Sequence, residues 1–200
     1  MSEELEVKFL LSKPEGFISR LESSGATLES ERVHEYNLRF DTPDRALTRS
    51  FQVLRLRQDA RARVRYKGPG KISGGVHVRQ EIEYGVDDFE AARAMMEALG
   101  YEISFIYEKY RSTYHLENVE IVVDETPLGT FTEIEGPDAR AIQLAAARLG
   151  LDWESRIVES YVSLFEAAKR ALALPFRDLT FENFEGMPVA PNALGVKIGD

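Results

Sequence analysis

The chain has 200 residues, of which 44% are hydrophobic, enough to bury one ordinary core in a single domain. It contains no cysteine, which excludes disulfides, zinc–thiolate sites and thiol catalysis. The net charge of -9 argues against a nucleic-acid binder that works through a general positive field. No apolar run approaches the ~18 residues of a membrane span. The acidic N-terminus lacks a signal-peptide core, so we expect a cytoplasmic protein with no membrane partner.

Alternation of polar and apolar residues predicts eight strands, most of them joined by short connections. They lie at residues 4–11, 27–40, 51–58, 61–67, 76–84, 101–116, 119–124 and 130–136. Short connections between neighbouring strands favour antiparallel pairing. The pattern therefore predicts an α+β protein built on one antiparallel sheet.

Helices are predicted where apolar residues recur at helical spacing between start and stop signals. They lie at residues 14–24, 87–100, 138–149 and 156–173. The glycine-rich segment 68–75 is predicted to be a flexible loop. Beyond Pro175 the sequence is punctuated by proline and glycine, so we divide the chain into a domain at 1–174 and a tail at 175–200. This tail either wraps the domain or is disordered.

Nearly every predicted strand has one charged and one more apolar face, because successive side chains point to opposite sides. In the first strand Glu4, Glu6 and Lys8 share a face. Charged faces are most often the solvent side of an open sheet. Arginine and glutamate at strand centres, with both signs together, instead favour a sheet that closes. If the sheet closes, the charged faces line a lumen of about eight strands, wide enough to hold one small ligand.

A lumen that carries both signs of charge suits a triphosphate bound together with a divalent metal. Arginine forks and lysine match phosphate charge, and Mg2+ commonly bridges carboxylates to substrate phosphates. The pairs Glu4/Glu6 and Glu133/Glu135 have i,i+2 spacing. This spacing places both carboxylates of a pair on one strand face, about 7 Å apart. The two pairs could converge on a metal across the barrel.

At these residues the sequence resembles the CYTH superfamily, also called triphosphate tunnel metalloenzymes, from about residue 3 to 165. The signature Glu4-x-Glu6-x-Lys8 is weak alone, since glutamate and lysine are common. It gains specificity because further family motifs follow in order. These are Arg55-x-Arg57, YKGP at 66–69, Arg79-x-Glu81-x-Glu83, Lys109-x-Arg111, Asp124, LGTFTEIEG at 128–136 and SYVSL at 160–164.

The resemblance implies a closed eight-stranded antiparallel β-barrel, a triphosphate tunnel with helices packed outside. It also implies a metal-dependent reaction on a triphosphate, with Mg2+ or Mn2+ as the cofactor. The implied metal ligands are Glu4, Glu6, Asp124, Glu133 and Glu135. The implied phosphate-binding residues are Arg55, Arg57, Lys67, Arg79, Lys109 and Arg111. Lys8, together with Glu4 and Glu6, is assigned to catalysis, where it could bind phosphate or assist proton transfer. Asp124, Glu81 and Glu83 could complete the carboxylate set or orient the basic residues; Arg63 and Arg65 are further lumen candidates.

Family members divide mainly between two reactions on a triphosphate-bearing small molecule. The LGTFTEIE and SYVSL motifs resemble class IV adenylyl cyclases, which convert ATP to cyclic AMP and pyrophosphate, and this is the preferred prediction. Such cyclases carry a histidine–phenylalanine pair before the first motif, whereas only MSE precedes it here. The alternative is a triphosphatase acting on inorganic triphosphate, thiamine triphosphate or a nucleoside triphosphate; a third is a non-catalytic polyphosphate- or nucleotide-binding module. The sequence leaves a homodimer open, and structural or surface roles are expected for His34, His77 and His115.

Overall fold

The computed structural model describes residues 2–200, except the side chains of residues 2–4 and of His77. The eight strands are β1 (Ser2–Leu10), β2 (Thr27–Asp41), β3 (Val53–Gln58), β4 (Ala62–Ser73), β5 (Val76–Val86), β6 (Glu102–Leu116), β7 (Val119–Thr126) and β8 (Gly129–Glu135). The helices are α1 (Pro14–Ser23), α2 (Ala46–Arg49), α3 (Phe89–Ala98), α4 (Ala139–Arg148), α5 (Tyr161–Leu172) and α6 (Pro191–Leu194). Short 3-10 turns lie at Trp153–Ser155 and Glu182–Phe184.

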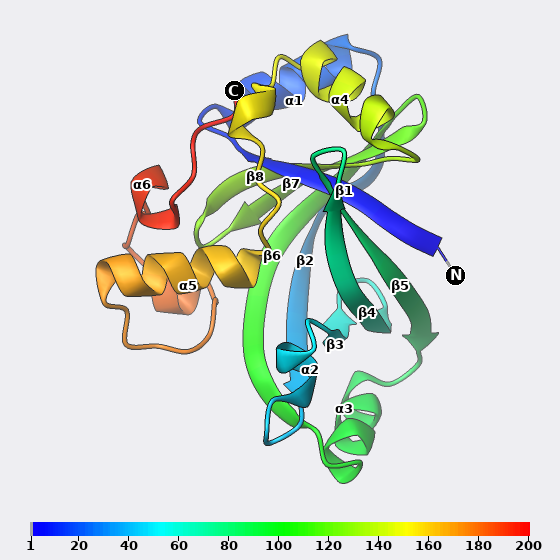
Figure 1. Cartoon of the computed structure of the whole chain (residues 1–200), viewed down its shortest axis with the longest axis vertical. Coiled ribbons are helices and arrows are strands. Elements are labelled where there is room, and N and C mark those ends of the chain that lie inside the picture. Colours follow the sequence, from blue (N-terminus) through cyan, green and yellow to red (C-terminus); the bar gives the residue numbers. More distant parts are fainter. Residues whose placement is uncertain (1) are drawn as a thin grey trace.

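The strands form one closed antiparallel barrel in the order β1-β5-β4-β3-β2-β6-β7-β8 (Figure 1). Closure depends on β1, which pairs with β5 through its first half and with β8 through its second half. In the second pairing Glu6 lies opposite Glu135 and Lys8 lies opposite Glu133. The predicted α+β class and closed eight-stranded barrel are confirmed.

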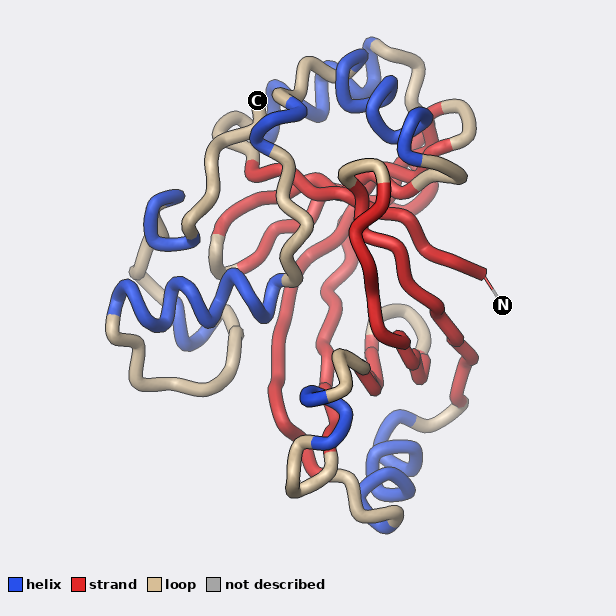
Figure 2. The backbone as a smooth tube through the Cα atoms, viewed as in Figure 1, coloured by secondary structure: helices blue, strands red, loops and turns tan. Residues whose placement is uncertain are grey.

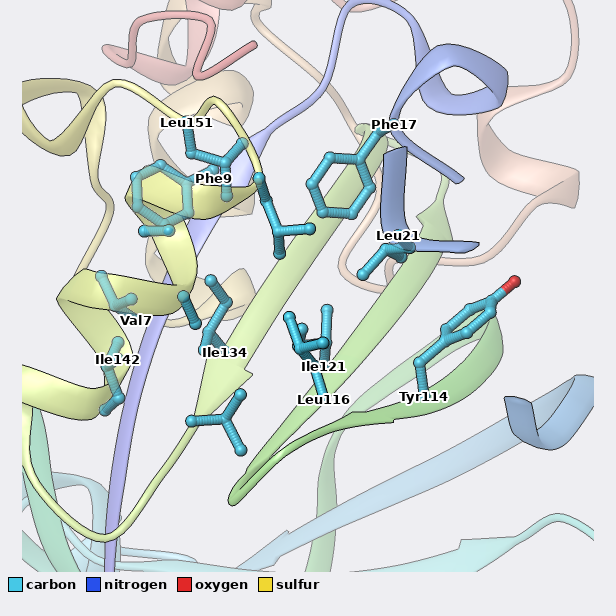
Figure 3. Close-up of a cluster of buried hydrophobic side chains, with 14 of the residues drawn as sticks. Val7, Phe9, Phe17, Leu21, Tyr114, Leu116, Ile121, Ile134, Ile142 and Leu151 are labelled. Carbon is cyan, nitrogen blue, oxygen red and sulfur yellow. The ribbon is translucent and has the colours of Figure 1, made fainter. Parts of the chain in front are cut away.

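The apolar faces of several strands point outward and are covered by helices. Figure 3 shows the main cluster, in which α1 contributes Phe17 and Leu21, α4 contributes Ile142, and β1 contributes Val7 and Phe9. All five of these side chains are at most 1% exposed. Because their outer faces are used in this way, the charged faces of the same strands are turned into the barrel.

Residues 175–200 wrap the barrel, the first of the two alternatives left open by the sequence. Leu179 bridges to Tyr107 of β6, and Ile198 bridges to Leu10 of β1. At the C-terminus the Asp200 carboxylate accepts hydrogen bonds from the backbone N–H groups of Ser12 (2.6 Å) and Lys13 (3.1 Å). Figure 2 shows this segment as mostly irregular chain between the short helices at this end of the sequence.

The predicted flexible loop at 68–75 is wrong. Strand β4 continues to Ser73, past a register shift between Lys67 and Gly70, and its last residues pair with β5. Only Gly74 and Gly75 form the turn, with φ of 59° and 80°, as a two-residue hairpin connection needs. The start predicted for the last long helix, at residue 156, is also wrong. The backbone of Ile157 pairs with Lys8, so α5 begins only at Tyr161, after its cap Ser160.

The sequence analysis did not predict α2, a four-residue helix after the turn that follows β2. The Asp41 side chain organises this turn by accepting hydrogen bonds from the backbone N–H groups of Thr42, Leu47 and Thr48. Among residues 2–200, no helix has the length and apolar character needed to span a membrane.

Two residues of α4 test how this helix packs. Ile142 is fully buried against the barrel, whereas Leu144 is 61% exposed. We expect Ile142→Ala to lower the free energy of unfolding by about 2–5 kcal/mol, and Leu144→Ala to change it by less than about 0.5 kcal/mol. Urea unfolding followed by circular dichroism measures both. Equal losses in the two variants would contradict this packing.

Candidate functional site: a charged tunnel

The inner face of the barrel surrounds a cavity of about 830 Å3 to which all eight strands and the start of α5 contribute. Of its thirty described lining residues, twenty are charged, eleven of them basic and nine acidic. The chain as a whole carries a net charge of -9. The positive charge is therefore concentrated inside the barrel, where field lines between low-dielectric walls attract anions.

Glu35 of β2 forms the centre of the tunnel wall and is 1% exposed. Its carboxylate lies 2.8 Å from Arg57 Nη1 and 3.5 Å from Lys109 Nζ. Burial alone would raise the pKa of Glu35, but the positive charges of Lys109, Arg57 and Arg111 outweigh it and hold the pKa well below its usual range. Glu35 is therefore ionised and orients two of the predicted phosphate-binding residues; the sequence analysis did not select it.

Asp124 of β7 is a second buried acid in this network. It accepts hydrogen bonds from Lys109 Nζ (2.8 Å), from Arg111 Nε and Nη2 (2.6 Å each) and from the Tyr161 hydroxyl (2.9 Å). A carboxylate offers about four acceptor positions, so these contacts engage it fully. Of the two roles predicted for Asp124, metal ligand or orienting group, the contacts favour the second.

Lys8 lies at the junction between the network and the acidic part of the tunnel. Its Nζ is 3.6 Å from Glu133, 4.0 Å from Glu6 and 5.5 Å from the centre of the Tyr161 ring. Burial would lower the pKa of Lys8, but the charges of Glu6, Glu133 and Asp124 reverse this and raise it. Lys8 is thus a cation at neutral pH and can serve as a phosphate ligand or proton donor.

Glu133 is engaged by cations. Arg111 Nη2 donates to it at 2.7 Å, in addition to the Lys8 contact. Burial would raise the pKa of Glu133, but Lys8, Arg111 and Lys109 lower it well below its usual range. The predicted metal ligand Glu133 is therefore ionised, and two cations already lie against it.

Three other carboxylates lie side by side on adjacent strands. Glu135 of β8 is opposite Glu6 of β1 on one side and opposite Glu120 of β7 on the other, and all three line the cavity. Like charges directly opposite one another destabilise a sheet, whereas a divalent cation held by hard carboxylate oxygens relieves the repulsion. This donor set fits Mg2+ or Mn2+. We call Glu6, Glu120 and Glu135 the acid row.

Sequence reasoning missed Glu120, although the signal was present. Asp124 and Val122 share a strand face, and the same alternation extends two residues further to Glu120. The backbone of Glu4 pairs with that of Arg79, but its side chain lies outside the described part of the structure. The predicted role of Glu4 in metal binding stays a prediction.

At another part of the tunnel Arg55 and Arg57 of β3 enter the cavity. Arg55 is 8% exposed, and its Nη1 donates to the Tyr107 hydroxyl at 2.6 Å. Its Nε and Nη2 are buried and have no hydrogen-bond partner among the described residues. Burial and the neighbouring Arg55 lower the pKa of Arg57 to about 10, so both remain cations at neutral pH. Arg55 thus has donors that an anion in the lumen can use.

The remaining predicted residues line the same cavity on β4 and β5. Glu81 contacts Arg65 (2.6 Å) and Lys67 (3.0 Å), and Glu83 pairs with Arg65. These contacts support the prediction that Glu81 and Glu83 orient basic residues. Arg79 reaches the carbonyls of Gly68 (3.0 Å) and Phe51 (3.3 Å).

The histidines lie away from the centre of the network or outside the described side chains. His34 packs on Tyr110. His115 is half-exposed, and its Nε2 lies 2.7 Å from a Glu29 oxygen. One ligand atom each from Glu29, His115 and Glu120 falls within 4.8 Å of the others. The acid row therefore continues toward a histidine that the sequence did not distinguish from the other two.

The buried network makes a testable prediction at Glu35. Glu35→Gln leaves Arg57 without its compensating charge and Lys109 with Asp124 alone, and we expect a loss of about 3–5 kcal/mol in the free energy of unfolding at pH 7. Because the folded pKa of Glu35 lies below the unfolded value of 4.5, its contribution is present above about pH 4.5 and declines as the pH falls further. Urea unfolding from pH 7 to pH 3 should therefore show a steeper acid loss in the parent chain than in the variant. If the stability of the two proteins falls in parallel with pH, the assigned role of Glu35 is contradicted.

Comparison with known proteins gives one family and a set of shared folds. The model of the CYTH domain matches residues 2–165. A Vibrio parahaemolyticus protein described as a candidate adenylate cyclase is 22% identical, with a TM-score of 0.71 over 79% of this chain and 94% of that one. A Pyrococcus horikoshii protein described without an activity is 26% identical, with a TM-score of 0.68 over 79% and 96%.

A further solved structure comes from Hippeastrum. It is described as a candidate adenylyl cyclase with a dominant triphosphatase activity, and is 18% identical with a TM-score of 0.56 over 97% of this chain and all of that one. No curated protein matches the chain. With the barrel, the tunnel residues and a family match over most of the sequence in agreement, the chain belongs to the CYTH domain family.

Proposed function

We propose that this protein is a divalent-metal-dependent enzyme that hydrolyses a triphosphate inside the barrel. The observation that carries the proposal is the shared cavity. It brings a row of carboxylates and a set of ordered cations, including the unsatisfied donors of Arg55, to one lumen. Pure anion binding would not need the acid row, which favours an enzyme over a binding module.

The cations would bind and orient the triphosphate. Lys109, Arg111 and Arg57 are each held by a buried acid, so their positions are set before substrate arrives. Such preorganised charges stabilise a phosphoryl-transfer transition state without rearrangement during the reaction. Their acids lie in the wall, and the phosphates would complete the remaining donor positions.

Mg2+ or Mn2+ would be held by the acid row, together with Glu4 as the sequence predicts, and would neutralise phosphate charge and polarise a phosphorus–oxygen bond. Lys8 lies next to this row at Glu6. In hydrolysis the oxygen of a water attacks phosphorus while the bond to the bridging oxygen breaks. Lys8, protonated at neutral pH, can stabilise or protonate the departing oxygen. Glu133 orients Lys8 by its contact with Nζ.

Hydrolysis is favoured over cyclisation by the lining of the tunnel. Adenine recognition usually needs an apolar slot with an aromatic or aliphatic face. Among the described lining residues the aromatic ones are Tyr107 and Tyr161, whose hydroxyls are bonded to Arg55 and Asp124 within the wall. The valines of the lining come one each from β2, β3, β7 and α5 and are far outnumbered by charged residues: Val33, Val53, Val122 and Val162. The adenylyl cyclase predicted from the sequence motifs is the second candidate, and one experiment separates the two.

We expect purified protein with Mg2+ or Mn2+ to release orthophosphate from inorganic triphosphate, without forming cyclic AMP from ATP. The assay compares inorganic triphosphate, thiamine triphosphate and ATP, each with either metal and with EDTA. If cyclic AMP is the main product, the protein is an adenylyl cyclase and the proposal of hydrolysis is wrong. If a triphosphate binds and no product forms, the protein is a non-catalytic binding module and not an enzyme.

The acid row gives a residue-level prediction. Glu135→Gln removes one carboxylate charge, and we expect kcat/KM to fall by at least ~100-fold, the order seen when one preorganised electrostatic group is lost. The fold should survive, because repulsion among the three acids also falls. Glu125→Gln, on the same sheet but paired with exposed Arg32 outside the cavity, is the control and should keep its activity. Full activity in both variants would refute the assignment.

A further inference from the structure

Arg39 of β2 lies directly opposite Arg55 of β3. We infer that these two arginines form a dedicated anion subsite, which binds one phosphate group of the substrate at the end of the tunnel remote from Lys8 and Glu133. This inference rests on the proposed function, and it assigns a substrate contact to a residue that belongs to none of the motifs above.

The two guanidinium groups lack acidic partners. Within the part of the chain that the structure describes, neither Arg39 nor Arg55 makes an ion pair. The nearby acid Asp41 is engaged elsewhere, since its two oxygens accept hydrogen bonds from the backbone N–H groups of Leu47 and Thr48 in α2. Burial and the positive charges of Arg55 and Arg79 lower the pKa of Arg39. Burial would lower the pKa of Arg55, but Tyr107, Glu35 and Glu81 act against it and raise that pKa. Two positive charges therefore lie opposite each other, and that of Arg39 is the less compensated.

This arrangement is costly to the empty protein. Like charges opposite each other on neighbouring strands are unfavourable, and a desolvated cation without a partner costs more than an exposed one. A phosphate resolves both problems, because two guanidinium forks can each donate paired hydrogen bonds to its oxygens. Arg55 supplies buried Nε and Nη2 donors with no other partner, and Tyr107 holds its Nη1 in place.

The subsite has a defined place along the tunnel. On β2, Arg39 lies four residues beyond Glu35, or about 13 Å along the strand. Glu35 contacts Lys109 and Arg57, and Lys109 leads through Asp124 and Arg111 to Glu133 and Lys8. Arg57 lies two residues from Arg55 on the same face of β3, about 7 Å along the strand, so a triphosphate bound by Arg57 would extend one end toward Arg39 and Arg55.

The test measures binding instead of turnover. Isothermal titration calorimetry with inorganic tripolyphosphate in EDTA, which prevents metal-dependent hydrolysis, compares the parent chain with Arg39→Gln, Arg39→Lys and Arg93→Gln. Arg93 lies on α3 outside the tunnel, paired with Glu97, so Arg93→Gln removes the same charge elsewhere. We expect Arg39→Gln to weaken binding roughly 10- to 100-fold, as for lost hydrogen bonds to a charged group. Arg39→Lys should fall in between and Arg93→Gln should bind like the parent.

Thermal unfolding without anion provides an independent readout. Because Arg39→Gln removes an unneutralised charge, its Tm should equal or exceed that of the parent, while its rise in Tm with tripolyphosphate should be smaller. If the parent binds tripolyphosphate and the Kd of Arg39→Gln lies within twofold of the parent's, the subsite is overturned while the proposed function stands. A variant with a lowered Tm would also overturn it, because Arg39 would then be structural. A parent that does not bind tripolyphosphate without metal would also overturn the subsite, whereas the proposed function is tested separately by the turnover assay with metal.

Discussion

The charges inside this barrel must neutralise one another for the fold to exist at all. Isolated ions in a protein interior cost several kilocalories per mole each, and twenty of the described residues that line the cavity are charged. The structure meets the constraint with alternating partners: Glu35 between Arg57 and Lys109, Asp124 between Lys109 and Arg111, and Glu133 between Arg111 and Lys8. Because each of these acids contacts two cations, the network is continuous from β3 through β2, β6, β7 and β8 to β1.

This neutralisation also determines which groups remain available to a ligand. Cations fixed from behind by acids keep their positions and direct their remaining donors into the lumen, which is the preorganisation that phosphate chemistry requires. Arg39 and Arg55 on one side, and the acid row on the other, are where like charges lie opposite one another on adjacent strands. Sites that give up stability in this manner are commonly functional. The arginine pair therefore marks where an anion would bind, and the acid row marks where a metal cation would bind.

The period-two pattern gave each strand one charged and one apolar face, which left an open sheet and a closed barrel both possible, and the resemblance to the CYTH family predicted the barrel. It also placed Lys8, Arg55, Arg57 and Arg111 in the lumen, where the structure has them. It could not show that Asp124 accepts hydrogen bonds from three side chains on two other elements, since those contacts depend on barrel geometry. Arg39 escaped notice for a similar reason: its significance comes from Arg55 across the strand pair, not from its neighbours in sequence.

The outer cover and the inner site are linked by Tyr161. Its hydroxyl donates to Asp124 inside the wall, while the helix it begins, α5, packs Phe165 against Phe105 of β6 and against Phe176 and Phe184 of the C-terminal segment. The family match ends at residue 165, yet these contacts continue beyond it. The apolar packing of residues 176–184 on α5 thus holds in place a helix whose first residue orients a tunnel carboxylate. A segment without charged motifs of its own therefore supports the position of Asp124, and through it of Lys109 and Arg111.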